Sequence, residues 1–157
     1  MSDRKLALQS WNRLSSLPLG AAAWSKMVSA RAPYFRSISP RMVELAPGRC
    51  IAEMKKRWRI ANHLGTVHAI AMCNLAEFAG GLMTEVSVPP GHRWIPKGMT
   101  VEYLHKAQTD LRAVCVCDPL PEFGAESFEW PVTVDVQDRG GLTVFRAVIR
   151  MWISRKQ

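Results

Sequence analysis

The sequence lacks any long apolar run, because no segment approaches the ~18 consecutive apolar residues that a membrane span needs. Its first residues, MSDRKLALQSW, also lack the apolar stretch of a secretory signal. We therefore expect a soluble, cytoplasmic protein with no membrane partner. Residues 1–31 hold five basic residues, one acid and several serines. That composition also occurs in organelle transit peptides, but it suits packed helices equally well.

The sequence also lacks a cysteine framework. Its four cysteines, Cys50, Cys73, Cys115 and Cys117, lie in apolar surroundings without the regular close pairs of disulfide-rich or zinc-binding domains. Cys115 and Cys117 alternate onto one face of a predicted strand and could form half of a metal site, but no second Cys or His pair completes it. We expect reduced thiols that pack in the core, no disulfide and no metal site.

Acidic residues are scarce, with 13 Asp and Glu against 21 Lys and Arg, so the formal net charge is +8. Such a surface attracts polyanions, including phosphate-bearing ligands, nucleic acids and acidic proteins. The sequence has no glycine-rich phosphate loop and no recognisable nucleic-acid-binding motif. Nucleic acid is therefore the less favoured partner. Any single charged side chain on this surface is usually just hydrated and binds no partner.

The length of 157 residues, about half of them apolar, predicts a single domain over residues 1–157 with one core and no internal repeats. Residues 6–28 indicate a helical segment that is interrupted at Pro18 and Gly20 and covers one edge of a sheet. Strands follow at 42–45 and 51–60, joined by a turn at 46–49. Two-residue alternation in the second strand predicts a basic face of Glu53, Lys55, Arg57 and Arg59 and a core face of Ala52, Met54, Trp58 and Ile60.

The second half of the chain alternates between apolar and polar residues in a pattern typical of antiparallel strands. After a Pro-Pro-Gly loop at 88–91, strands are predicted at 99–103, 111–117, 128–136 and 142–153, with a hairpin turn at 137–141. The inward-facing residues of the last strand are Phe145, Ala147, Ile149, Met151 and Ile153. An apolar helix followed by several strands needs a sheet against which to pack, so the fold class is α+β.

That helix is the central feature of the sequence. Residues 62–85 form a glycine-containing loop that runs into an apolar helix, and between residues 68 and 85 only Glu77 and Glu85 carry a formal charge. On a helical wheel most apolar residues fill one wide arc, which predicts a buried helix. Glu77 lies mid-helix on the narrow polar stripe opposite. A carboxylate with so little water around it has to be paired, protonated or catalytic.

The pattern of Asn62, Gly65, Thr66 and His68, followed by Glu77 on an apolar helix, resembles the hotdog-fold acyl-CoA thioesterases, and within them the phenylacetate-pathway type. The resemblance covers residues 62–85 and continues loosely to residue 152. Residues 1–30 and 93–103 look more like an uncharacterised bacterial branch of that superfamily. The chain departs from the family pattern after the histidine, where Ala69 and Ile70 replace two glycines.

This resemblance implies a hotdog fold, in which a curved antiparallel sheet wraps around one long central helix. Here the N-terminal helical segment at 1–31 would be added to it. It also implies a homodimer, or a homotetramer made of two such dimers, because the sheets of family members join edge to edge. The partly apolar outer face of the last strand, with Val144, Val148 and Trp152, is weak support for such an assembly.

The implied function is that of a hydrolase that cleaves, or a protein that binds, an acyl-CoA thioester, with coenzyme A as part of the substrate and no separate cofactor. Thioester hydrolysis needs donors for an oxyanion, a carboxylate and a group that orients the reactants. By resemblance, Ala69 takes the oxyanion-hole position, Glu77 is the base or nucleophile, and Asn62 positions water or the thioester. The remaining candidates are His68 at the catalytic loop and, for substrate binding, Gly65, Thr66, Asn74, Arg57, Arg59 and Arg150.

Helix geometry constrains this set. The nine residues from His68 to Glu77 correspond to about 180° of rotation and about 13.5 Å of rise. One helix cannot bring both side chains to one thioester carbon. If the site exists, the helix start of one subunit has to face Glu77 of another, as in the shared sites of the family.

Structural alternatives exist for each candidate. Glu77 could bond a backbone group or a partner side chain, Asn62 and Thr66 could be loop and helix-capping residues, and His68 could lock the loop against the sheet. Two other function classes also fit the sequence. The altered pair Ala69 and Ile70 favours a non-catalytic module that binds acyl-CoA or acyl-carrier protein, and the basic surface would suit a nucleic-acid-binding protein.

Overall fold

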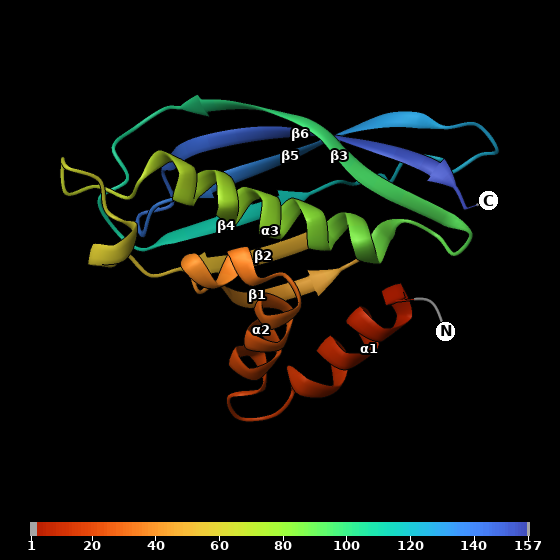
Figure 1. Ribbon diagram of the computed structural model, residues 1–157, viewed down its shortest axis with the longest axis horizontal. Coiled ribbons are helices and arrows are strands. Elements are labelled where there is room, and N and C mark those ends of the chain that lie inside the picture. Colours follow the sequence, from red (N-terminus) through yellow and green to blue (C-terminus); the bar gives the residue numbers. More distant parts are fainter. Residues whose placement is uncertain (1–2, 157) are drawn as a thin grey trace.

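The computed structural model describes residues 3–156. Two helices come first, then two strands, a long helix and four further strands (Figure 1). Two short 3-10 helices, η1 and η2, lie in the connections. The elements are α1 (Asp3–Leu14), α2 (Gly20–Arg31), η1 (Pro33–Ser37), β1 (Arg41–Ala46), β2 (Arg49–Met54), η2 (Trp58–Ile60), α3 (Ala69–Ser87), β3 (His92–Tyr103), β4 (Leu111–Val116), β5 (Phe128–Gln137) and β6 (Thr143–Arg155).

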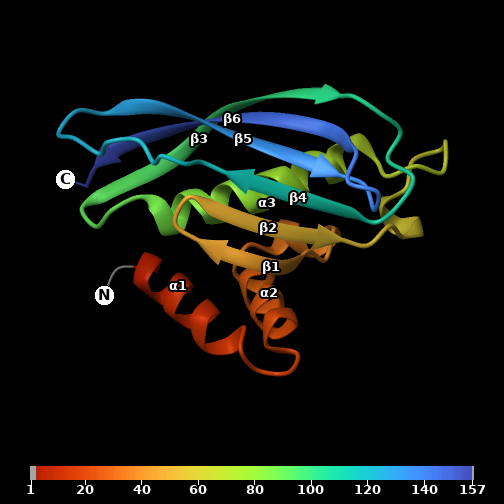
Figure 2. The same cartoon turned by 180° about the vertical axis from the view of Figure 1, so that it is seen from behind.

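The strands form one antiparallel sheet in the order β1-β2-β4-β5-β6-β3. The sheet curves around α3, as both views in Figures 1 and 2 show. Because β3 follows α3 in the chain but pairs with β6, the connection crosses the sheet and leaves β3 at the edge opposite β1. This arrangement confirms the predicted α+β hotdog fold.

The core lies between α3 and the concave face of the sheet. Leu75, Phe78 and Met83 on the helix are fully buried, as the helical wheel predicted. Gly80 allows close packing against the sheet, since a Cβ atom there would lie 2.9 Å from Ile149 Cδ1 and 3.2 Å from Val134 Cγ2. The predicted alternation in the last strand is confirmed, because Phe145, Ala147, Ile149, Met151 and Ile153 are all buried.

The two N-terminal helices lie outside the sheet, next to the edge strand β1 (Figure 2). The chain breaks between them at the Pro18–Gly20 segment, and the Trp11 and Trp24 rings pack edge to face with centroids 5.3 Å apart. The buried Ser25 hydroxyl accepts a 2.7 Å hydrogen bond from the Met42 N–H of β1. The helical segment therefore covers one sheet edge, as predicted.

The second predicted strand is shorter than expected. β2 ends at Met54, not Ile60, and the backbone N–H of Lys56 donates to Asp110 Oδ1 at 2.9 Å instead of continuing the ladder. The chain then forms η2, so the two-residue period is lost. Ile60 is buried as predicted, but the Trp58 side chain is 90% exposed, so its assignment to the core was wrong.

The other strand boundaries agree with the sequence except at β3, which begins at His92, seven residues before the predicted start. Among the described residues, no helix combines the length and the apolar character needed to span a membrane.

Candidate active site

The loop before α3 is held by its own side chains. Asn62 Oδ1 accepts hydrogen bonds from the backbone N–H groups of Leu64 (3.0 Å) and Thr66 (3.1 Å), and Asn62 Nδ2 donates to Thr66 Oγ1 at 2.9 Å. Gly65 has a φ of 71°, in the left-handed region that favours glycine. These contacts match the structural alternative for Asn62 and Thr66, and their predicted roles at a substrate stay predictions.

His68 is the N-cap of α3. Its Nδ1 atom accepts a 3.1 Å hydrogen bond from the Ile70 N–H, and its carbonyl accepts one from the Ala71 N–H at 3.0 Å. Its own N–H donates to the Ile60 carbonyl at 2.8 Å, which ties the helix start to η2. The hydrogen bonds among the described residues include none from the Ala69 N–H, so that group keeps the partial positive charge of a helix start.

Glu77 lies on the side of α3 that the sheet does not cover. The sequence suggested that this carboxylate has little water around it, but in the chain its side chain is exposed, because the curved sheet closes over the opposite face of the helix. No hydrogen bond or ion pair joins Glu77 to the described residues. The second acid of the helix differs, since Glu85 accepts a 2.6 Å hydrogen bond from the Trp94 indole.

The exposed strip of α3 runs beside the edge strand β3. Cys73 and Ile70 lie about one and two turns before Glu77 on this strip, respectively. Cys73 Sγ is 3.8 Å from the Tyr103 hydroxyl of β3. Partial desolvation, followed by the hydrogen bond and charge of Cys73, raises the pKa of Tyr103 above its usual value. Tyr103 is therefore a neutral phenol at physiological pH, and it can donate or accept a hydrogen bond next to the strip.

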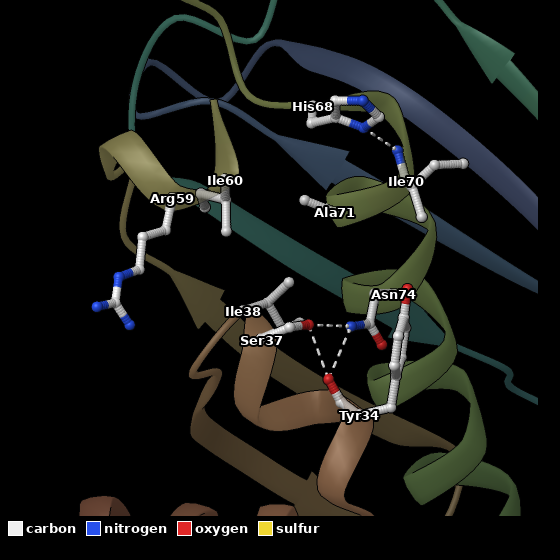
Figure 3. A pocket seen from close by; sticks show the side chains of 9 residues that line it. All are labelled: Tyr34, Ser37, Ile38, Arg59, Ile60, His68, Ile70, Ala71 and Asn74. Atoms are coloured by element: carbon white, nitrogen blue, oxygen red, sulfur yellow. Dashed lines mark hydrogen bonds between the residues drawn. The ribbon is translucent and has the colours of Figure 1, made fainter. Parts of the chain in front are cut away.

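A pocket of about 260 Å³ opens beside the start of α3 (Figure 3). It lies between η1, η2 and the first two turns of the helix. Its lining consists of Tyr34, Ser37, Ile38, Arg59, Ile60, His68, Ile70, Ala71 and Asn74. The lining combines apolar side chains with a few hydrogen-bonding groups, as ligand sites commonly do.

Asn74 lies in the wall of this pocket and is 4% exposed. Its Nδ2 atom donates to Ser37 Oγ at 3.1 Å and to the Tyr34 carbonyl at 3.4 Å. A carbonyl can only accept, so the Tyr34 contact fixes the orientation of the amide. Asn74 Oδ1 is buried and has no partner among the described residues.

The structure brings some of the predicted residues together and separates others. Arg59, His68 and Asn74 share the pocket, whereas Glu77 lies further along the helix. Arg57 donates to the Ile38 carbonyl at 2.7 Å. Arg150 lies on the outer face of β6, 3.8 Å from the Glu129 carboxylate, so it does not join the other two arginines.

The sequence analysis missed Tyr34 and Ser37 and misplaced Trp58. The two residues of η1 come to the pocket from a segment about forty positions before Asn74, and no spacing in the sequence links them. The run of basic residues around Trp58 was the available signal for an exposed aromatic side chain. Among residues 3–156, no group of three or more His, Cys, Asp and Glu side chains is placed to hold a metal ion.

Comparison with known proteins identifies the family. The model of a family described as a domain of unknown function (DUF4442) matches residues 20–153. The crystal structure of the genomics target APC5556 is 43% identical, covers 98% of this chain and 99% of its own, and superimposes with a TM-score of 0.85. No protein of curated function matches the sequence.

More distant structures share the fold. A Pseudomonas aeruginosa protein of unknown function, described as a probable thioesterase, is 22% identical over 89% of this chain and 97% of its own, with a TM-score of 0.76. A mutant of the phenylacetic acid degradation protein PaaI from Thermus thermophilus is 17% identical over 78% of this chain and 98% of its own, with a TM-score of 0.64.

Proposed function

Because the chain belongs to the DUF4442 family and has the hotdog fold, we propose that it is a thioesterase that hydrolyses acyl-CoA thioesters with Glu77 as the general base or nucleophile. The observation that carries this proposal is the environment of Glu77. It is an exposed carboxylate on a helix that is otherwise poor in charge, and it has no hydrogen bond or ion pair with the described residues. Glu85 on the same helix is bonded to Trp94, whereas the Glu77 carboxylate has no such contact within the described residues and is open to a substrate or a second copy of the chain.

The start of α3 supplies a group that complements this carboxylate. The N–H groups of Ile70 and Ala71 donate to His68, the residue that caps the helix. The Ala69 N–H is therefore left to bind a developing oxyanion. As base, Glu77 would take a proton from a water molecule whose oxygen attacks the thioester carbonyl. The carbon–sulfur bond then breaks, and the thiolate of coenzyme A takes up the proton. As nucleophile, Glu77 would attack the thioester carbonyl, the carbon–sulfur bond would break, and the coenzyme A thiolate would leave. Water would then hydrolyse the resulting mixed anhydride, which releases the free acid and restores the Glu77 carboxylate.

We place this chemistry between two copies of the chain. Ala69 and Glu77 are eight residues apart, or about 12 Å along the helix, so one helix cannot offer both groups to one carbonyl. β3 is a twelve-residue edge strand with an open side, and the apolar residues along it include Ile95 (60% exposed), Met99 (37%) and Tyr103 (53%). Pairing with the β3 strand of a second copy would satisfy the free backbone groups and cover these side chains.

The test is a hydrolysis screen over short, long and aromatic acyl-CoAs, with detection of the released thiol. We expect turnover of at least one class by the wild type and its loss in Glu77→Gln. Glu126→Gln, on an exposed loop, is the matched control and should keep full activity. No turnover with any class, or full turnover by Glu77→Gln, would contradict the proposal.

A second candidate is a non-catalytic module that binds acyl-CoA or acyl-carrier protein. This function is favoured by Ile70 at the helix start, whose side chain is 53% exposed. The phenylacetate-pathway thioesterases that the sequence resembles have glycine at this position. A side chain at this position limits how closely a thioester can approach the backbone N–H groups. Acyl-CoA binding without turnover by the wild type would support this function instead.

A further inference from the structure

Trp58 is the most exposed of the large apolar side chains in the described chain, at 90%. It is nevertheless part of an ordered turn. The Ile60 N–H donates to the Arg57 carbonyl at 3.1 Å and the Ala61 N–H to the Trp58 carbonyl at 3.1 Å. Ile60 is buried next to the turn, and its carbonyl accepts from the His68 N–H. An exposed indole is thus held at a fixed place beside the start of α3.

Basic residues flank Trp58 in the sequence. Lys55, Arg57 and Arg59 are exposed, and neither Lys55 nor Arg59 forms an ion pair with the described residues. Arg59 also lines the pocket described above, and in Figure 3 its guanidinium lies on the outer side of that pocket, away from His68 and Ile70 on the helix. The pocket therefore connects the basic turn with the helix start.

We propose that Trp58 stacks on the adenine ring of coenzyme A, while Arg59 and Lys55 bind its phosphates. This inference rests on the proposed function, and it assigns the end of the substrate that is remote from the thioester. An exposed indole with basic residues on both sides of it in the sequence complements a purine that carries phosphates. From this site the pantetheine arm would follow the pocket past Arg59 to the helix start.

The inference is tested by direct binding, which needs no turnover. Coenzyme A and pantetheine, which lacks the nucleotide, are titrated into wild type, Trp58→Ala and Trp58→Phe by calorimetry. Stacking of a base on an aromatic residue is worth about 5-fold to 100-fold in affinity. Trp58→Ala should therefore raise the Kd of coenzyme A at least 5-fold and leave that of pantetheine unchanged, and Trp58→Phe should recover most of the loss. Leu17→Ala, an exposed apolar residue between α1 and α2, should change neither.

Kinetics give a second readout. If acyl-CoA is hydrolysed, Trp58→Ala should raise KM and leave kcat within a few-fold, because a remote contact is shared by the ground state and the transition state. If no acyl-CoA is hydrolysed but Trp58 still governs coenzyme A binding, the proposed activity fails and the nucleotide site stands.

Three outcomes would overturn the inference. An unchanged Kd for coenzyme A in Trp58→Ala would show that the indole does not contact the nucleotide. Dissociation of an oligomer on the same substitution would assign Trp58 to a subunit contact. Binding of a single-stranded oligoribonucleotide that excess coenzyme A cannot displace would assign this surface to nucleic acid.

Discussion

The indole N–H of Trp94 donates a 2.6 Å hydrogen bond to the Glu85 carboxylate, which joins β3 to the last turns of α3. This contact separates the roles of the two acids on the central helix. Glu85 is committed to the packing of the edge strand, whereas Glu77, two turns earlier, has no such partner among the described residues. A comparison of the two acids is therefore an internal test of which one is catalytic.

Glu77→Gln should lower kcat by ~10² or more, because loss of an acid–base or nucleophilic group costs at least this much. Its melting temperature should hardly change, since an exposed side chain without partners contributes little to stability. Glu85→Gln should show the reverse, with a lower melting temperature from the weakened Trp94 contact and turnover within a few-fold. Thiol release and thermal unfolding, measured on both variants, decide between these patterns.

The native protein should be a dimer or a larger assembly, and Ile95→Lys should weaken it. The substitution places a charge on the open side of β3, where a second copy would pair. Light scattering on wild type and variant measures the mass of the assembly. We expect the variant to have both a lower mass and a lower rate of acyl-CoA hydrolysis. A fully active monomer of 17.6 kDa would contradict both the shared site and the assembly.

Ser25→Ala should destabilise the protein through the contact between α2 and β1. The Ser25 hydroxyl donates to the Ala21 carbonyl and accepts from the Met42 N–H, both at 2.7 Å, in a buried position. Its removal leaves a buried backbone donor without a partner, which costs about 1–3 kcal/mol. The melting temperature should fall by about 2–4 °C for each kcal/mol. Ser16→Ala, whose hydroxyl is exposed and bonds the Arg13 carbonyl, should change it much less.

Asp110 should make stability depend on acid pH. The backbone N–H of Lys56 and then the Arg139 side chain hold the pKa of this carboxyl below its usual value. A lowered folded-state pKa stabilises the fold above the unfolded pKa of about 3.9, and this contribution is lost as the pH falls through the folded pKa.

The melting temperature of Asp110→Asn should therefore lie below that of wild type at pH 7, and the gap should shrink below about pH 4. Thermal unfolding of both proteins across this range measures the gap, with Glu126→Gln, an exposed loop acid, as the control. A gap that stays constant with pH would show that the charge of Asp110 does not stabilise the fold.

The local pattern of apolar residues, prolines and glycines was sufficient to predict most of the helices, strands and core residues. The apolar arc of α3 and the alternation in β6 require burial on one face, whatever the rest of the chain does, so Phe78 and Ile149 could be assigned to the core from the sequence. Pro18 and Gly20 mark the break between the two N-terminal helices for an equally local reason, because neither residue continues a helix well. The hotdog topology itself came from the resemblance of residues 62–85.

The surroundings of the candidate site depended on tertiary contacts. The N–H of Lys56 is bonded to Asp110, 54 positions later, instead of a neighbouring strand, and Trp58 in the turn that follows is exposed. Asn74 meets Ser37 across a separation of 37 residues. The sequence by itself determined that Glu77 is an isolated charge on an apolar helix. Only the curvature of the sheet, which closes over one face of α3 and leaves the other open, decided that its carboxylate is exposed beside a free strand edge.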